Sequence, residues 1–197
     1  MLIVLVGKSG SGKTVIVEEM KKLGYEKLVT YTTRPMRDGE IEGKDYFFLT
    51  MDEFDKRERE GFFGEAVSYN TSNGLAKYGM SVESLTDKEN KRVTILNPAG
   101  LEIIRQKGLN PYTVYLDVDE NVILERLKKR GDDDKEIETR LRTDANDFER
   151  FESDVRINVK DNIMQPEVFA QTIAILGECN VKECSLKSEV GHFSKLD

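Results

Sequence analysis

Apolar residues along this chain form short uninterrupted runs that alternate with segments in which they recur at helical spacing. Residues 2–6 (LIVLV) are an unbroken apolar run, which is typical of a strand buried on both faces of a parallel sheet. In the segment that follows, Ile16, Met20 and Leu23 share one face of a helix that Gly24 is placed to end. This order of strand and helix predicts an α/β fold, with a parallel β-sheet flanked by helices.

The second half of the chain repeats this order. We expect strands at residues 93–96, 112–118 and 155–159, besides a second strand at 28–32. Helices are expected after Asn97, after the capping residue Asp119, across residues 137–148 and from Pro166 onward. Periodicity fades beyond Gly177, which predicts a loosely ordered C-terminal tail over residues 177–197.

Residues 33–90 depart from the alternation. A short strand at 45–49 precedes a capping box formed by Thr50 and Glu53, which opens a helix ending near Gly61. A strand at 62–67, a polar and turn-prone stretch at 70–77 and a helix after Ser81 complete the segment. We interpret 33–90 as a small mixed α+β subdomain inserted into a single domain, 1–197, whose core is 1–32, 91–129 and 147–176 and whose helical lid is 130–146.

The segment between the first strand and the first helix is rich in glycine. Residues 7–14 (GKSGSGKT) satisfy the pattern G-x-x-x-x-G-K-[ST] at each fixed position. In such a loop the backbone N–H groups cradle phosphates, Lys13 reaches the outer phosphates, and the Thr14 hydroxyl ligates the bridging Mg²⁺. The sequence therefore predicts a P-loop NTPase core that binds a triphosphate through Gly7, Ser9, Gly10, Ser11, Gly12, Lys13 and Thr14.

Arginines gather at two other places. Arg34 and Arg37 stand on a short loop stiffened by a proline, and two guanidinium forks so placed suit a second phosphate. Arg126 and Arg130 lie one helical turn apart, and Arg140 follows a glycine and three aspartates that are typical of a mobile flap. Two phosphate sites in one chain favour phosphoryl transfer between bound phosphates.

Composition narrows the classes of partner. The 197 residues carry a formal net charge of -7, which argues against binding to a nucleic-acid polymer or an anionic membrane. No stretch approaches the ~20 apolar residues of a membrane span, and no basic leader precedes the first strand, so we expect a cytoplasmic protein. Cys179 and Cys184, with the sole histidine His192, make a poor metal site, and we expect free thiols.

The near absence of histidine also fits the chemistry. The phosphate of a nucleoside monophosphate is already an anionic nucleophile near neutral pH. Transfer to it needs no general base, and catalysis reduces to positioning and charge neutralisation.

Taken together, the motifs resemble the guanylate kinase family in order and spacing. The resemblance is carried by residues 7–14, by 32–40 (TTRPMRDGE), by Asp45 and Tyr46, by Glu65, by Tyr78 and Gly79, and by the Arg126 to Arg140 region. It covers residues 1–176 and implies ATP-dependent phosphorylation of GMP, with dGMP as a further candidate. It also implies ATP and Mg²⁺ as cofactors, small-molecule nucleotides as partners, and a monomer or homodimer.

The resemblance assigns roles residue by residue. It implies that Arg34, Arg37, Tyr46 and Tyr78 hold the acceptor phosphate, that Thr30, Glu65 and Asn97 lie at the acceptor base, that Arg126, Arg130 and Arg140 close over the ATP phosphates, and that Asn158 lies near the adenine. Glu65 is the expected specificity residue, because a carboxylate can accept hydrogen bonds from guanine N1–H and N2–H₂ together, a donor pair that adenine lacks.

Four departures from the family pattern stand out. Lys8 replaces a proline, and the segment between Glu65 and Tyr78 is a few residues longer than usual. Met80 stands where the family has serine or threonine, and an Asp-x-Asp pair reads Ile-Leu-Asn here, ending at Asn97. The phosphate-handling groups remain, whereas two groups that usually contact guanine are altered.

These departures keep other functions open. One is a kinase of the same fold that acts on another nucleoside monophosphate or on a ribose phosphate. Another is a non-catalytic guanylate-kinase-like binding module, which the intact Gly12-Lys13-Thr14 disfavours. A regulatory GTPase is disfavoured because the sequence has no Asn-Lys-x-Asp motif.

Overall fold

The computed structural model describes residues 1–197 except 72–73, 88, 160–164 and 194–197. Its centre is a five-stranded sheet in the order β2-β7-β1-β8-β9. The strands are β1 (Leu2–Gly7), β2 (Glu26–Lys27), β7 (Arg92–Ile95), β8 (Tyr112–Val118) and β9 (Val155–Val159), and each neighbouring pair is parallel. The predicted parallel α/β core is confirmed.

Alternating side chains of β1 pack into two different cores, which explains why its apolar run is unbroken. Ile3 and Leu5 face a cluster that includes residues of α1 (Lys13–Lys22) and α7 (Pro166–Phe193). Val4 and Val6 face a cluster with residues of α4 (Pro98–Gln106) and α6 (Asp134–Phe148). All four β1 side chains have no exposed surface, so the strand is fixed from both faces.

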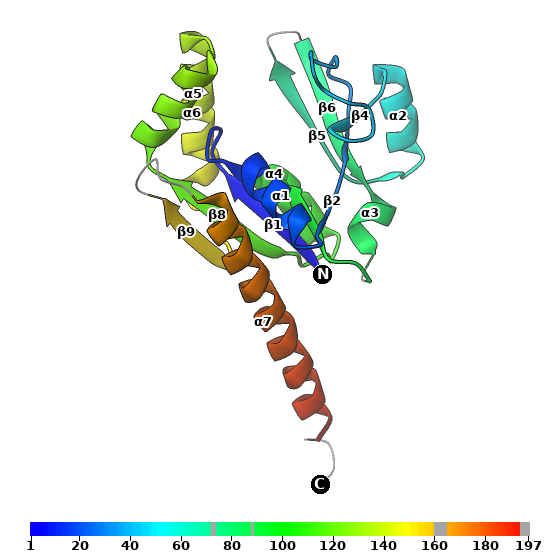
Figure 1. The fold of residues 1–197 in the computed structure, drawn as a ribbon. Coiled ribbons are helices and arrows are strands. Elements are labelled where there is room, and N and C mark those ends of the chain that lie inside the picture. Colours follow the sequence, from blue (N-terminus) through cyan, green and yellow to red (C-terminus); the bar gives the residue numbers. More distant parts are fainter. Residues whose placement is uncertain (72–73, 88, 160–164, 194–197) are drawn as a thin grey trace.

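A second, four-stranded sheet has the order β4-β3-β6-β5. Its strands are β3 (Thr30–Thr32), β4 (Tyr46–Phe48), β5 (Phe63–Thr71) and β6 (Gly74–Ser81); β3 and β4 are parallel and the other pairs antiparallel. It carries α2 (Met51–Arg59) and α3 (Val82–Thr86), and the predicted Thr50–Glu53 capping box opens α2. Figure 1 shows this lobe on one side of α1, and α5 (Glu120–Arg130) with α6 on the other.

Two strand predictions need correction. The segment 28–32 is not one core strand: β2 joins the central sheet, whereas Thr30–Thr32 pairs with β4 and β6 in the second sheet, although the core was predicted to include residues 1–32. The polar stretch 70–77 is not a long turn, because β5 runs to Thr71 and β6 begins at Gly74. In the first case the sheet that a strand joins, and in the second the pairing of a polar stretch, were decided by cross-strand partners and not by local sequence.

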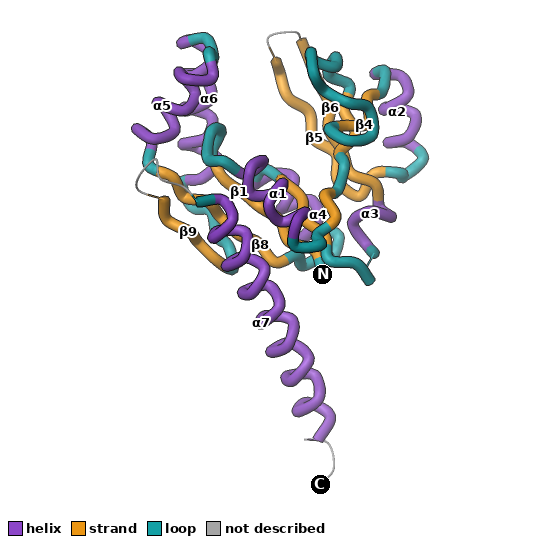
Figure 2. The backbone as a smooth tube through the Cα atoms, in the orientation of Figure 1, coloured by secondary structure: helices purple, strands orange, loops and turns teal. Residues whose placement is uncertain are grey.

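The predicted loose tail is also wrong, because α7 continues as one helix to Phe193 and extends away from both sheets (Figure 2). Gly177 is not a helix stop. A Cβ built there would lie 3.0 Å from Ile3 Cδ1, so the glycine lets the helix pack closely on β1. In the described part of the chain, no helix combines the length and apolar character that crossing a bilayer requires.

Candidate active site

The glycine loop, residues 7–14, connects β1 to α1. Gly10 and Gly12 have φ of 78° and 92°, a left-handed conformation that glycine adopts without steric cost, and Gly12 is the N-cap of α1. This conformation lets the backbone curl around the space above the helix N-terminus, where N–H groups and the helix dipole favour an anion.

Lys13 is folded into this loop. Its Nζ donates to the carbonyl oxygens of Gly7 at 2.6 Å and Lys8 at 2.8 Å, and to Ser11 Oγ at 3.2 Å. Burial lowers the pKa of Lys13 to about 8. The loop therefore holds a cation, partnered by neutral oxygens, at the position predicted to meet the outer phosphates.

Asp144 of α6 also reaches the loop, and sequence reasoning missed it. Its Oδ2 accepts a hydrogen bond of 2.7 Å from the backbone N–H of Ser9. Burial raises the pKa of Asp144, while the Ser9 N–H and the Lys13 charge oppose that rise. An acidic residue on an amphipathic helix carries no signal for such a contact, because tertiary packing alone brings α6 to the loop.

The three predicted lid arginines lie beside the loop. Arg126 donates from Nη1 to the Gly10 carbonyl at 3.3 Å. Arg130 and Arg140 both pair with Asp132, the latter at 3.0 Å. Arg126 and Arg130 line a cavity of about 410 Å³, the loop cavity, whose other lining residues are Gly10, Gly12, Lys13, Thr14, Val15 and Leu127.

A second cavity, of about 420 Å³, lies between the two sheets and is called the inter-sheet cavity below. Seven of the residues predicted for the site line it: Lys13, Thr14, Thr30, Tyr46, Glu65, Tyr78 and Asn97. Val67 and Tyr69 also line it and were missed, although the alternation of β5 places them on the same face as Glu65. Tyr46, Tyr78 and Tyr69 form a row of edge-on ring contacts along one wall.

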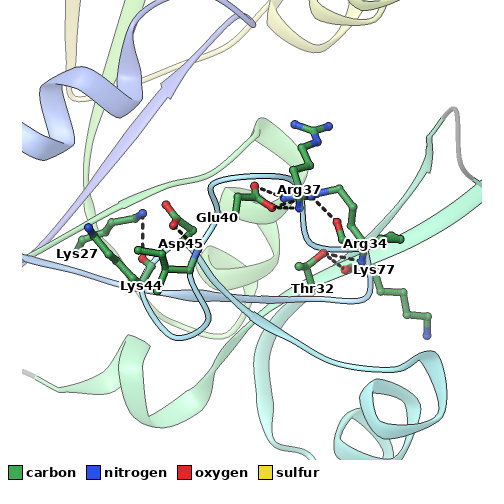
Figure 3. A network of polar contacts seen from close by, with 10 residues as sticks. Lys27, Thr32, Arg34, Arg37, Glu40, Lys44, Asp45 and Lys77 are labelled. Carbon is green, nitrogen blue, oxygen red and sulfur yellow. Dashed lines mark hydrogen bonds and ion pairs between the residues drawn. The ribbon is translucent and has the colours of Figure 1, made fainter.

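Arg34 is buried behind this wall and is held by Glu40 (Figure 3). Nη1 and Nη2 of Arg34 contact the two carboxylate oxygens at 3.0 and 2.6 Å, and Nη1 also donates to the Pro35 carbonyl at 2.6 Å. Glu40 accepts a further hydrogen bond of 2.7 Å from the backbone N–H of Arg37, whose side chain is exposed. The Arg34 guanidinium holds the pKa of Glu40 below its usual value.

Glu65 is the most unusual group in the inter-sheet cavity, because its carboxylate is only 1% exposed. Burial raises its pKa to about 7, while the Lys107 charge and the Met80 backbone N–H oppose the rise. The carboxylate rests against the first turn of α4: a Cβ built on Gly100 would lie 2.6 Å from Glu65 Oε1. A carboxyl that titrates near neutral pH inside a cavity is a candidate recognition group.

The altered positions have structural partners. Asn97 is the N-cap of α4, and its Oδ1 accepts from the Gly100 N–H at 2.8 Å. Burial raises the pKa of the nearby Tyr69 phenol, and the Asn97 side chain opposes that rise. Met80 has no exposed surface, and its Sδ accepts from Thr94 Oγ1 at 3.4 Å. Met80 therefore lies beneath the cavity wall and belongs to the core around α4.

Other predicted residues lie apart from these contacts. Asn158 is exposed on β9 and lines neither cavity. Cys179 is a free, exposed thiol, whereas the side chain of Cys184 and that of His192 lie outside the described residues. The described residues contain no group of three or more His, Cys, Asp or Glu side chains placed to hold a metal ion.

Comparison with known proteins adds independent evidence. The family model described as guanylate kinase matches residues 1–168. The guanylate kinase of Onion yellows phytoplasma is 33% identical over 158 residues, covering 75% of this chain and 72% of the relative. The guanylate kinase of Blochmanniella floridana is 26% identical over 182 residues, covering 89% of this chain and 86% of the relative.

A solved structure agrees in fold. The crystal structure of guanylate kinase from Anaplasma phagocytophilum aligns with a TM-score of 0.65 at 23% identity and covers 91% of this chain and 85% of that one. With the family model matching most of the sequence, and with a relative one third identical over three quarters of it, the chain belongs to the guanylate kinase family.

Proposed function

We propose that this chain transfers the γ-phosphoryl group of ATP to GMP and releases ADP and GDP. The observation that carries the proposal is that Lys13 and Thr14 line both cavities. A triphosphate in the loop cavity and a monophosphate in the inter-sheet cavity would meet at these two residues. Bringing two phosphates together in a fixed geometry removes most of the entropic barrier to their reaction. Membership of the guanylate kinase family supports the same reaction.

On the donor side, we assign the glycine loop to the ATP phosphates. Lys13 would exchange its carbonyl partners for the outer phosphates, and Arg126, Arg130 and Arg140 would offset charge that develops during transfer. The Thr14 hydroxyl is exposed at the start of α1, and a single hydroxyl suits Mg²⁺, which keeps mostly phosphate and water ligands. When bound, Mg²⁺ would offset charge on the phosphates. We assign Asn158 to the adenine.

On the acceptor side, we assign Arg34, Arg37, Tyr46 and Tyr78 to the phosphate. Glu40 takes the Nη1–Nη2 edge of Arg34, so the phosphate would use the Nε edge or displace Glu40. Thr30 and the ionised Glu65 would contact the base, with Glu65 accepting from guanine N1–H and N2–H₂.

The remaining features of the proposal follow from the chemistry of the substrates. GMP brings its own anionic nucleophile, so no side chain has to remove a proton. We expect a cytoplasmic enzyme, a monomer or homodimer, whose partners are small-molecule nucleotides, with Mg²⁺ required for turnover.

An ADP-release assay tests the proposal directly. The protein is incubated with ATP and Mg²⁺ and offered GMP, dGMP, AMP, CMP, UMP or dTMP in separate reactions. We expect turnover with GMP, and with dGMP as the second candidate. Turnover confined to another monophosphate would keep the phosphoryl transfer and overturn the acceptor. No turnover on any of the six, with ATP still bound, would overturn the proposal.

A further inference from the structure

The first turn of α4 packs directly against the buried carboxylate of Glu65, although the two segments are 35 residues apart in sequence. The contact is closest at Gly100, where a Cβ would lie 2.6 Å from Oε1 and 3.3 Å from Cδ of Glu65. Contacts shorter than about 3.0 Å do not occur for real Cβ atoms. Glu65 can therefore occupy its present position only because residue 100 has no side chain.

Glycine at this position is costly for the helix itself. In a helix interior glycine is about 1 kcal/mol less favourable than alanine. Position 100 is the third residue of α4, and the helix is a short one of 9 residues. The unfavourable residue is explained by the space that the carboxylate needs.

Asn97 completes the same contact. Its Oδ1 caps α4 by accepting the Gly100 N–H at 2.8 Å and lies 3.1 Å from the same Cβ position that Glu65 Oε1 approaches. The Asn97 oxygen and the Glu65 carboxylate therefore both approach the same point on α4. Aspartate, which the family has at this position, would cap the helix equally well.

We propose that Gly100 and Asn97 are positioning residues that seat Glu65, Gly100 by leaving room for the carboxylate and Asn97 by capping the turn of α4 on which Gly100 lies. Asn97 then acts through Glu65 and does not itself contact the acceptor base. The proposal rests on the proposed function, because the seat matters only if Glu65 contacts guanine. Other charged or titratable groups near Glu65 are Lys107, which directly follows α4, and Tyr69 on β5.

The steric half of the seat is tested with Gly100→Ala. We expect the KM for GMP to rise at least tenfold, kcat to change less, and the KM for ATP to stay within twofold. Gly177→Ala is the matched control, since it puts a Cβ 3.0 Å from Ile3 on the far face of the sheet and should leave both KM values unchanged. An unchanged KM for GMP in Gly100→Ala would overturn the seat. The melting temperature of Gly100→Ala shows whether a loss of GMP affinity reflects the lost seat or a misfolded protein, because alanine by itself favours the helix.

The capping half of the seat is tested at position 97. Serine caps a helix as well as asparagine does, so Asn97→Ser should change the KM for GMP by less than threefold. Asn97→Asp also keeps the cap and should stay within the same limit, whereas Asn97→Ala removes the cap and should weaken GMP binding by more than threefold, measured by calorimetry with GMP.

The outcomes separate the two proposals. A large loss of GMP affinity in Asn97→Ser, together with a gain in Asn97→Asp, would show that residue 97 contacts the base and would overturn its role in the seat. Failure of the wild-type protein to bind or phosphorylate GMP would instead overturn the proposed function. Calorimetry on the wild-type protein distinguishes these cases before any variant is made.

Discussion

The glycine loop and the inter-sheet cavity are both suited to anionic ligands, yet they are built in different ways. The loop is eight consecutive residues whose conformation is set by glycines and by the start of α1. The cavity takes its residues from β2 to β7 and from the first turns of α1 and α4, and its polar groups are side chains. A contiguous site depends on local backbone geometry, whereas a dispersed site depends on how two sheets pack.

The comparison also extends to charge. In the loop, Lys13 is a partly buried cation whose hydrogen bonds go to neutral oxygens, and desolvation lowers its pKa to about 8 although the Asp144 carboxylate opposes the fall. In the cavity, Glu65 is a buried anion whose raised pKa of about 7 makes it ready to take a proton. Each group is destabilised by burial until a ligand of opposite character reaches it.

Removal of the loop cation should have the largest effect. Lys13→Ala should lower kcat by about 10²–10³-fold, because a preorganised charge is lost where negative charge develops. GMP affinity, measured by calorimetry, should stay within threefold, since Lys13 only borders the inter-sheet cavity. A parallel loss of GMP affinity would mean that the two sites are not separable.

Removal of the cavity anion should be smaller and selective. Glu65→Gln should raise the KM for GMP about 10- to 100-fold, the cost of about 1–3 kcal/mol for an unmatched buried hydrogen-bonding group. Turnover with AMP should change little, so that discrimination between the two nucleotides falls. The assay compares kcat/KM for both acceptors, and equal losses on GMP and AMP would contradict the role given to Glu65.

The pH dependence should differ between the two sites. GMP affinity should strengthen about fivefold to tenfold between pH 6 and pH 8, because Glu65 must be ionised to accept two donors from guanine and its pKa is about 7. This pH dependence of GMP affinity should vanish in Glu65→Gln. Calorimetric titrations with GMP across this range provide the check.

The same group should affect stability in the opposite direction. Between the usual carboxyl pKa of 4.5 and about 7, the folded protein binds a proton on Glu65 that the unfolded chain has already released. The free energy of unfolding should therefore fall as pH rises through this window, by at most about 3 kcal/mol for this one group. Urea unfolding of the wild-type protein and of Glu65→Gln at pH 5 and pH 7.5 measures how the free energy of unfolding changes with pH. The same change in both proteins would contradict the burial of the carboxylate.

The smallest effect is expected where α6 meets the glycine loop. Asp144 occupies the Ser9 N–H, so its negative charge competes with an incoming phosphate. Asp144→Asn should tighten ATP binding about twofold to tenfold, the range expected for one opposing charge near a partly exposed site. Glu138→Gln removes one negative charge from an exposed position of the same helix and should have no effect. Weaker ATP binding in Asp144→Asn would mean that Asp144 supports the loop.

Much of the fold was predictable because its signals are local. The buried strand of residues 2–6, the capping box at Thr50 and the cap at Asp119 each follow from a few neighbouring residues, and the structure confirms them. The assignment of Thr30–Thr32 to the second sheet was not predictable, because it depends on pairing with Tyr46–Phe48 and with β6. The close packing of α7 on β1 at Gly177 was likewise not predictable, because it depends on residues at the other end of the chain.

The sequence by itself determined the glycine loop, the arginines that surround it and the family, because these are carried by consecutive residues or by spacing along the chain. Only the tertiary structure decided that Met80 is buried in the core, that Asn97 caps α4, that Asp144 meets the loop and that Glu65 is seated on Gly100. The burial and ionisation of a side chain depend on which distant segments cover it, and that information exists only once the chain has folded.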